Sequence, residues 1–143
     1  MVAVTGSGTT ELKEKNHVPY IQFKILSATG ILKHGFSTRK GGVSTGIFSS
    51  MNLNFKRGDD PDAVLENYRR MAAALNMRVE AMVLSDQTHT TNVRVITEED
   101  RGKGILRPQD YSDVDGMITT VPGIVLVTSY AGCVPLYLVD PVR

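Results

Sequence analysis

Short apolar runs separated by polar turns recur along the chain and predict a strand-rich protein. Residues 20–26 and 31–37 alternate weakly between apolar and polar positions, and Thr29-Gly30 favours a turn between them, so we predict a β-hairpin. Further short strands are predicted at residues 82–84, 93–96 and 117–120. Residues 124–130 and 136–139 are apolar at nearly every position, which predicts strands buried on both faces.

One segment has the 3.6-residue period of an amphipathic helix. Its apolar side chains form a single stripe: Val64, Leu65, Tyr68, Met71, Ala72 and Leu75. Asp59 or Asp60 can cap the N-terminus, Pro61 suits the first turn, and Asn76 can end the helix. The stripe predicts packing on a sheet. Strands and helix together indicate an α+β (α/β-like) fold, with mixed β-sheet layers and packed helices.

Polar stretches mark the expected organisation of the chain. Residues 1–16 are polar and predict a mobile tail, followed by a single domain over 17–143. Residues 39–56 hold three glycines and many hydroxyl and amide groups, and a loop of that length is usually functional. Residues 98–113 are charged and predict an exposed excursion. A strand as apolar as 136–139 normally lies inside a sheet, so we expect the domain to be truncated after it.

Composition narrows the class of protein. The 143 residues carry 16 Lys and Arg against 15 Asp and Glu, and a net charge of +1 gives no reason to expect nucleic acid or an anionic membrane as partner. No apolar run reaches the ~18 residues of a membrane span. With one Cys the chain forms no internal disulfide, so we expect a cytoplasmic protein.

Two residues can carry metal or nucleophile chemistry. Cys133 lies at the break between two predicted strands, and His89 follows Gln87-Thr88; an extended chain there would place Gln87 and His89 on one face. An imidazole and a thiolate suit zinc, although a catalytic zinc normally takes three protein ligands. The same pair could act as nucleophile and base of a hydrolase. His17 and His34 are interpreted as structural or exposed.

Arg39 is the candidate for anion binding. It lies between Ser37-Thr38 and Lys40-Gly41-Gly42, and a guanidinium beside hydroxyls and glycines can clamp phosphate or carboxylate. The spacing of a P-loop is absent.

Several segments, taken together and in this order, resemble the YfiH-type laccase-domain family, long called multicopper polyphenol oxidases. They are residues 34–44 (HGFSTRKGGVS), Asn52-Leu53-Asn54 with Gly58-Asp59-Asp60, Gln87-Thr88-His89, residues 115–119 (DGMIT), and Cys133-Val134-Pro135 with Asp140. The resemblance runs from about Ile31 to the last residue. Gly132 departs from it, since the family usually has Asp before the Cys.

The resemblance implies a zinc-dependent enzyme of the YfiH-like fold that phosphorolyses adenosine, inosine and methylthioadenosine and deaminates adenosine. His89 and Cys133 match two of its zinc ligands. The third belongs to a His-Ala-Gly-Trp-Arg-Gly motif expected beyond Arg143, and family members are roughly twice this length. We therefore expect an N-terminal half whose activity is impaired.

The resemblance also assigns substrate contacts to Ser37, Arg39 and Gln87, with phosphate on Arg39. Three His in the whole chain are too few for a multicopper oxidase, so zinc fits better than copper. Two other interpretations stay open: a Cys/His hydrolase without metal, and a non-catalytic fragment that self-associates through an exposed sheet edge.

Overall fold

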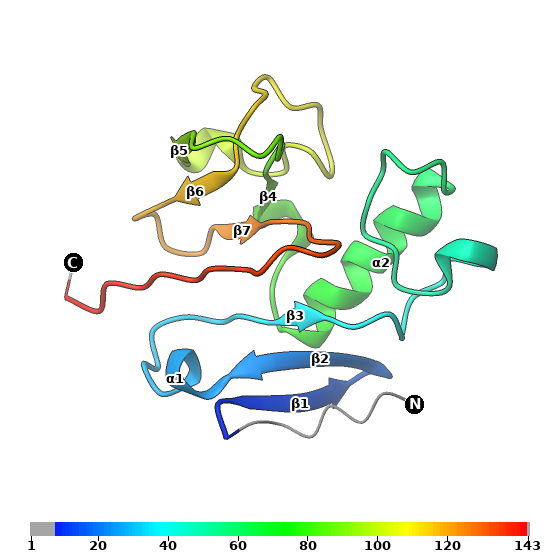
Figure 1. Cartoon of the computed structure of the whole chain (residues 1–143), viewed down its shortest axis with the longest axis horizontal. Helices are drawn as coiled ribbons and strands as arrows, with labels where there is room; N and C mark the ends of the chain where they lie inside the picture. Colours follow the sequence, from blue (N-terminus) through cyan, green and yellow to red (C-terminus); the bar gives the residue numbers. More distant parts are fainter. Residues whose placement is uncertain (1–7, 143) are drawn as a thin grey trace. The chain divides into compact units, whose positions relative to one another are not determined.

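The computed structural model describes residues 8–142, and these form an α+β architecture (Figure 1). The sequence predicts one domain over residues 17–143. In the structure the chain divides into two compact units. Unit 1 comprises Met1–Asn76 together with Leu136–Arg143, and unit 2 comprises Met77–Pro135. Unit 2 is thus an insertion into the sequence of unit 1.

Unit 1 contains an antiparallel sheet of order β1-β2-β3: β1 (Thr10–Lys15), β2 (Val18–Phe23) and β3 (Phe36–Ser37). The predicted mobile tail is wrong for residues 10–15, which pair with β2 along their whole length, and residues 1–7 lie outside the described residues. Asn16 and His17 have φ of 54° and 61°, the pattern of a two-residue hairpin turn. β1 therefore forms because of the hairpin turn and its pairing with β2, and not because of an apolar pattern in its sequence.

The predicted hairpin of residues 20–26 and 31–37 forms in shortened form. The first strand ends at Phe23, where α1 (Lys24–Ser27) begins. Of the second strand only Phe36 and Ser37 pair with β2, opposite Ile21 and Tyr20.

The predicted helix is confirmed as α2 (Pro61–Ala74). The Asp60 side chain accepts a hydrogen bond from the backbone N–H of Asp62 (2.9 Å), and Asn76 ends the helix with φ 53°. The helix contributes Met71 and Ala74 to a buried cluster that also contains Val18, Tyr20 and Met51. The apolar stripe therefore packs on the β2 face, as predicted. A short 3₁₀ turn, η1 (Gly46–Phe48), lies in the loop that precedes the helix.

Unit 2 is built from two parallel strand pairs, which confirms the short strands predicted there. β4 (Met82–Leu84) pairs with β7 (Val125–Val127), and β5 (Val93–Val95) pairs with β6 (Gly116–Ile118). Two 3₁₀ turns accompany them, η2 (Val79–Ala81) and η3 (Glu98–Asp100). The strand predicted at 124–130 is only three residues long.

The predicted exposed excursion at 98–113 is wrong at its centre. Asp100 and Lys103 are buried, and the Lys103 ammonium lies 2.8 Å from Asp100 and 2.9 Å from Asp110. Arg94 also contacts Asp100, at 3.1 Å. Because each buried charge has a partner of opposite sign, a charged sequence can fold inward here.

The buried strand predicted at 136–139 is also wrong. These residues form no strand, and their exposure alternates: Leu136 and Leu138 are 79% and 85% exposed, Tyr137 and Val139 both 37%. The Tyr137 ring packs 5.4 Å from that of Phe23. The segment therefore has the side-chain alternation of an extended chain, yet within the described part of unit 1 no strand pairs with it.

Within residues 8–142, no helix combines the length and the apolar character that crossing a membrane requires.

Candidate functional site

The parallel pairing of β4 with β7 places the starts of the two segments that lead to His89 and Cys133 at the same end of a sheet. Parallel strands finish at a common edge, and the chain runs from β4 toward His89 and from β7 toward Cys133. Gln87 links the segment after β4 to the segment after β7. Its Oε1 accepts hydrogen bonds from the Ser129 backbone N–H (2.8 Å) and from the Ser85 hydroxyl (3.0 Å).

The loop that carries His89 is held by one carboxylate. Asp115 accepts hydrogen bonds from the backbone N–H groups of Thr88 (3.0 Å), His89 (3.0 Å) and Thr90 (2.9 Å). The second parallel pair makes this contact possible, since Asp115 directly precedes β6 and the loop ends two residues before β5. The three amides, that of Thr90 foremost, lower the pKa of Asp115 to about 2.

A second carboxylate completes the loop. Asp113 accepts hydrogen bonds from the Thr88 hydroxyl and from the Asn92 amide (2.6 Å). His89 itself has φ 66°, a left-handed conformation that is uncommon for His. The prediction of an extended stretch with Gln87 and His89 on one face is therefore wrong. The His89 side chain is exposed and free to meet a ligand.

Cys133 is a free, exposed thiol in a bend. With His89 it offers one sulfur and one nitrogen donor, a combination that zinc accepts. The described residues contain no group of three or more His, Cys, Asp and Glu side chains that could hold a metal ion. The described residues therefore supply two candidate zinc donors and no complete metal site.

The loop in unit 1 that carries Arg39 is also held by backbone hydrogen bonds. The Arg39 carbonyl accepts hydrogen bonds from the backbone N–H groups of Ser50 and Met51, both at 3.0 Å, which closes the loop. The Arg39 side chain lines a cavity of about 190 Å³ together with Ile47, Phe48, Ser49, Met51 and Asn52. An exposed guanidinium at such a cavity can bind an oxyanion.

Helix α2 supports this loop through Asn67, a buried polar residue. Its side chain accepts a hydrogen bond from the Val43 N–H (2.7 Å) and donates to the Ser44 hydroxyl (2.9 Å) and the Asn52 carbonyl (2.8 Å). Asp59 accepts from Ser44 (2.6 Å) and Asn52 (2.9 Å), and the Ser44 contact is the main cause of its lowered pKa. Sequence analysis missed Asn67, whose only signal is an amide within the helical segment.

The predicted site residues fall into two groups. Ser37, in β3, shares unit 1 with Arg39, whereas Gln87, His89 and Cys133 belong to unit 2. In the sequence, Asp115 was noted only as part of residues 115–119, which resemble a family segment. The structure adds that its carboxylate holds the backbone of residues 88–90.

The structural interpretation of the remaining histidines is confirmed. His34 is 5% exposed and its Nε2 accepts a hydrogen bond from the Phe23 N–H (2.8 Å), while burial lowers its pKa. His17 is exposed in the β1–β2 turn.

Comparisons with known proteins relate the chain to a group of enzymes. Over 111 residues the chain is 38% identical to the purine nucleoside phosphorylase YlmD of Geobacillus stearothermophilus, covering 75% of this chain and 39% of that protein. YlmD of Bacillus subtilis, also named a purine nucleoside phosphorylase, is 35% identical over 113 residues, or 76% of this chain and 40% of the relative.

Solved structures give the same relationship. YfiH of Bacillus licheniformis superposes with a TM-score of 0.73 at 26% identity, over 85% of this chain and 45% of that one. The G. stearothermophilus YlmD structure gives a TM-score of 0.72 at 30% identity, with the same coverage.

The chain therefore spans about two-fifths of the length of the curated relatives it matches. A family model described as multi-copper polyphenol oxidoreductase laccase matches residues 33–143, most of the chain. By this match, the chain belongs to the laccase-domain family of YlmD- and YfiH-like proteins.

Proposed function

We propose that this chain forms part of a zinc-dependent purine nucleoside phosphorylase that acts on adenosine, inosine and methylthioadenosine and also deaminates adenosine. The observation that carries the proposal is the Asp115-held loop, which presents an exposed His89 at the sheet end from which the chain also leaves toward Cys133. The relatives' name, purine nucleoside phosphorylase, supports the choice of substrate class.

In this proposal His89 and Cys133 hold zinc through a ring nitrogen and the thiolate, and the third protein ligand comes from a part of the family's fold that this chain does not span. Zinc supplies Lewis-acid polarisation when bound. Asp115 fixes the backbone from which the His89 imidazole projects, so the position of its Cα is set before a ligand binds.

Phosphorolysis also requires a phosphate-binding group, for which unit 1 offers a candidate. A phosphate oxygen forms a bond to the ribose carbon while the bond to the purine nitrogen breaks, and the sugar passes through a cationic, oxocarbenium-like state. The enzyme's task is to hold phosphate in place. The exposed Arg39 guanidinium is suited to that task, and Ser37 and Gln87 are the proposed contacts to the nucleoside.

Metal binding gives the direct test. Cobalt(II) added to the metal-free chain should give the ligand-to-metal absorption of a Co–thiolate bond. Cys133→Ser should abolish that absorption, and His89→Ala should weaken metal binding at least tenfold. His17→Ala, a change in an exposed turn, is the matched control and should have no effect.

Turnover completes the test. With two ligands, the isolated chain should lose most of its zinc on dialysis and release little hypoxanthine from inosine and phosphate. Cobalt binding that survives Cys133→Ser would contradict the proposed ligand set. An iodoacetamide reaction at Cys133 that zinc does not slow would do the same.

A further inference from the structure

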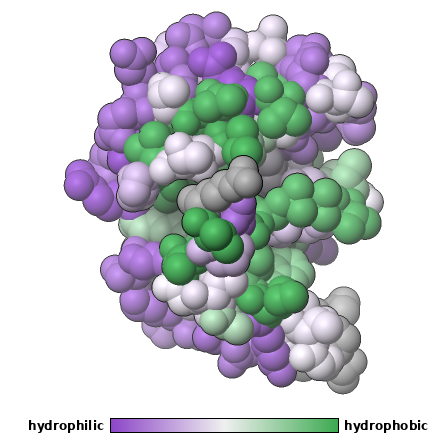
Figure 2. Space-filling view, turned by 90° about the vertical axis from the view of Figure 1, so that its left-hand side faces the viewer, coloured by the Kyte–Doolittle hydropathy of each residue, from purple (hydrophilic) through white to green (hydrophobic). Residues whose placement is uncertain are grey.

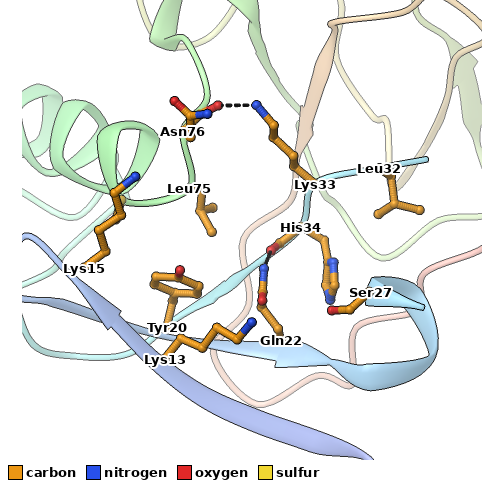
Figure 3. A pocket seen from close by; sticks show the side chains of 11 residues that line it. Lys13, Lys15, Tyr20, Gln22, Ser27, Leu32, Lys33, His34, Leu75 and Asn76 are labelled. Atoms are coloured by element: carbon orange, nitrogen blue, oxygen red, sulfur yellow. Dashed lines mark hydrogen bonds between the residues drawn. The ribbon is translucent and has the colours of Figure 1, made fainter. Parts of the chain in front are cut away.

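A second cavity in unit 1 has the character of an anion site. It encloses about 350 Å³ beside the C-terminal end of α2, and its walls come from β1, β2, the segment before β3 and the helix end (Figure 3). None of the residues that line it also lines the Arg39 cavity. It is therefore a distinct feature, and it involves none of the proposed zinc ligands.

Three ammonium groups surround this cavity, those of Lys13, Lys15 and Lys33, and its lining includes no carboxylate. Lys13 has an exposed ion pair with Glu11 at 3.5 Å, a weak contact. The Lys15 ammonium makes no ion pair or hydrogen bond among the described residues. Three cations facing one space repel one another, and a bound anion would relieve that repulsion.

The end of helix α2 explains only part of this charge. Lys33 donates a hydrogen bond to the Asn76 carbonyl (2.7 Å), which is a favourable contact at a helix C-terminus. The helix end carries about half a negative charge, so it leaves most of the charge of three lysines unbalanced. Glu11 offsets part of the charge of Lys13, and the Lys15 ammonium has no partner of opposite sign among the described residues.

Neutral groups add to the site. The Tyr20 side chain is 8% exposed, it lies between Lys13 and Lys15 in Figure 3, and none of the hydrogen bonds among the described residues involves its hydroxyl. A hydroxyl in this position can donate to an anion. Leu75 gives the cavity an apolar side against which the hydrocarbon part of a ligand can pack.

We propose that this cavity binds a phosphate-type dianion, either inorganic phosphate or the phosphoryl group of a small monoester, through Lys13, Lys15, Lys33 and the Tyr20 hydroxyl. Lysines are good point-charge partners for phosphate, and the volume lies in the range of small-molecule sites. The site is separate from the phosphate position proposed at Arg39 and would exist whether or not the chain takes part in phosphorolysis.

The test is a titration of the metal-free chain with inorganic phosphate at low ionic strength, followed by ¹H–¹⁵N NMR of the backbone amides. Phosphate should shift amides in β1 and at residues 74–76. Lys15→Gln should weaken this binding about tenfold, and Lys13→Gln combined with Lys15→Gln should weaken it further. The matched control is Lys24→Gln, an exposed lysine of α1 outside the cavity lining.

Two further experiments show which kind of phosphate binds and whether it binds at this cavity. Adenosine monophosphate that binds more tightly than phosphate identifies a monoester as the ligand; equal or weaker binding identifies free phosphate. Arg39→Gln should leave the shifts in β1 intact. The proposal is overturned if 10 mM phosphate shifts no amide around the cavity, or if Arg39→Gln removes the shifts and the lysine variants, folded by circular dichroism, do not.

Discussion

Asp115 and His89 illustrate what a single side chain contributes at the residue scale. Residue type and the family resemblance together marked His89 and Cys133 as candidate ligands, because imidazole and thiolate are the donors that zinc prefers. The left-handed backbone of His89 was not predictable, since it depends on a carboxylate 26 residues further along the chain. The sequence thus points to candidate side chains, whereas the backbone conformation that carries them depends on contacts made in the fold.

Asp115→Ala should therefore weaken zinc or cobalt binding by about 10–100-fold, the usual cost of losing a group that orients a metal ligand. Competition with a chelator of known affinity measures the effect. Asp62→Ala, an exposed carboxylate in the first turn of α2, serves as the control. Equal metal affinity in wild type and Asp115→Ala would show that the Asp115 carboxylate has no influence on His89.

His34 predicts a pH dependence near neutrality. Burial lowers its folded-state pKa, and its Nε2 is already engaged by the Phe23 N–H. A histidine with a depressed pKa stabilises the fold fully above its unfolded pKa of about 6.5, and this contribution is lost as the pH falls below that value. Urea unfolding at pH 7.5 and 5.5 should show lower stability at pH 5.5.

His34→Gln provides the comparison for that measurement. It should be less stable than wild type at pH 7.5 and should show a smaller change between the two pH values. The interpretation fails if both proteins lose the same stability on acidification.

At the element scale, the sequence predicted correctly the elements that are stabilised by interactions between residues close together in the chain. Helix α2, with its Asp60 cap and its end at Asn76, appeared as predicted because period, cap and stop signal lie within one short segment. β1 was missed because its sequence is polar and its formation depends on pairing with β2. The strand predicted at 136–139 failed for the opposite reason: an apolar sequence found no pairing strand among the described residues.

Gly42 tests how tightly the Arg39 loop packs on α2. A β-carbon there would lie 2.0 Å from the Ser50 carbonyl oxygen and 2.5 Å from Asn67 Oδ1, so the loop backbone must move. Gly42→Ala should cost about 1–3 kcal/mol in the free energy of unfolding. Thermal and urea denaturation measure it.

Gly132→Ala is the matched control for that variant, because no atom lies within 4 Å of the position of its β-carbon. Its free energy of unfolding should change by less than about 0.5 kcal/mol. Equal stability of the two variants would mean that the loop yields freely to the extra methyl group.

At the scale of the whole molecule, several large apolar side chains are exposed on the described surface. Figure 2 shows several apolar side chains on one face, and Leu136, Leu138 and Val142 are each at least 79% exposed. The relatives are more than twice as long as the region they share with this chain. An extended apolar segment without a pairing strand is a site for association.

We expect the isolated chain to self-associate in a concentration-dependent manner, measurable by analytical ultracentrifugation. Leu136→Ser combined with Leu138→Ser should raise the dissociation constant at least tenfold, because both exposed side chains then lose their apolar surface. Ile25→Ser, also a change at 79% exposure but on α1, should leave it unchanged. A wild-type chain that stays monomeric at high concentration would contradict the prediction.

The insertion of unit 2 into unit 1 sets an order of events during synthesis. The β1–β2 hairpin needs only a two-residue turn and can close as soon as Phe23 leaves the ribosome. β4 can form backbone hydrogen bonds with Gly102 and Lys103 first, but its pairing with β7 has to wait until about 40 further residues are made. Tyr137, which packs against Phe23, emerges later still. The first-made unit is thus the last to be completed, and the nascent chain passes through a long interval with open strand edges in which a holding chaperone would be of most use.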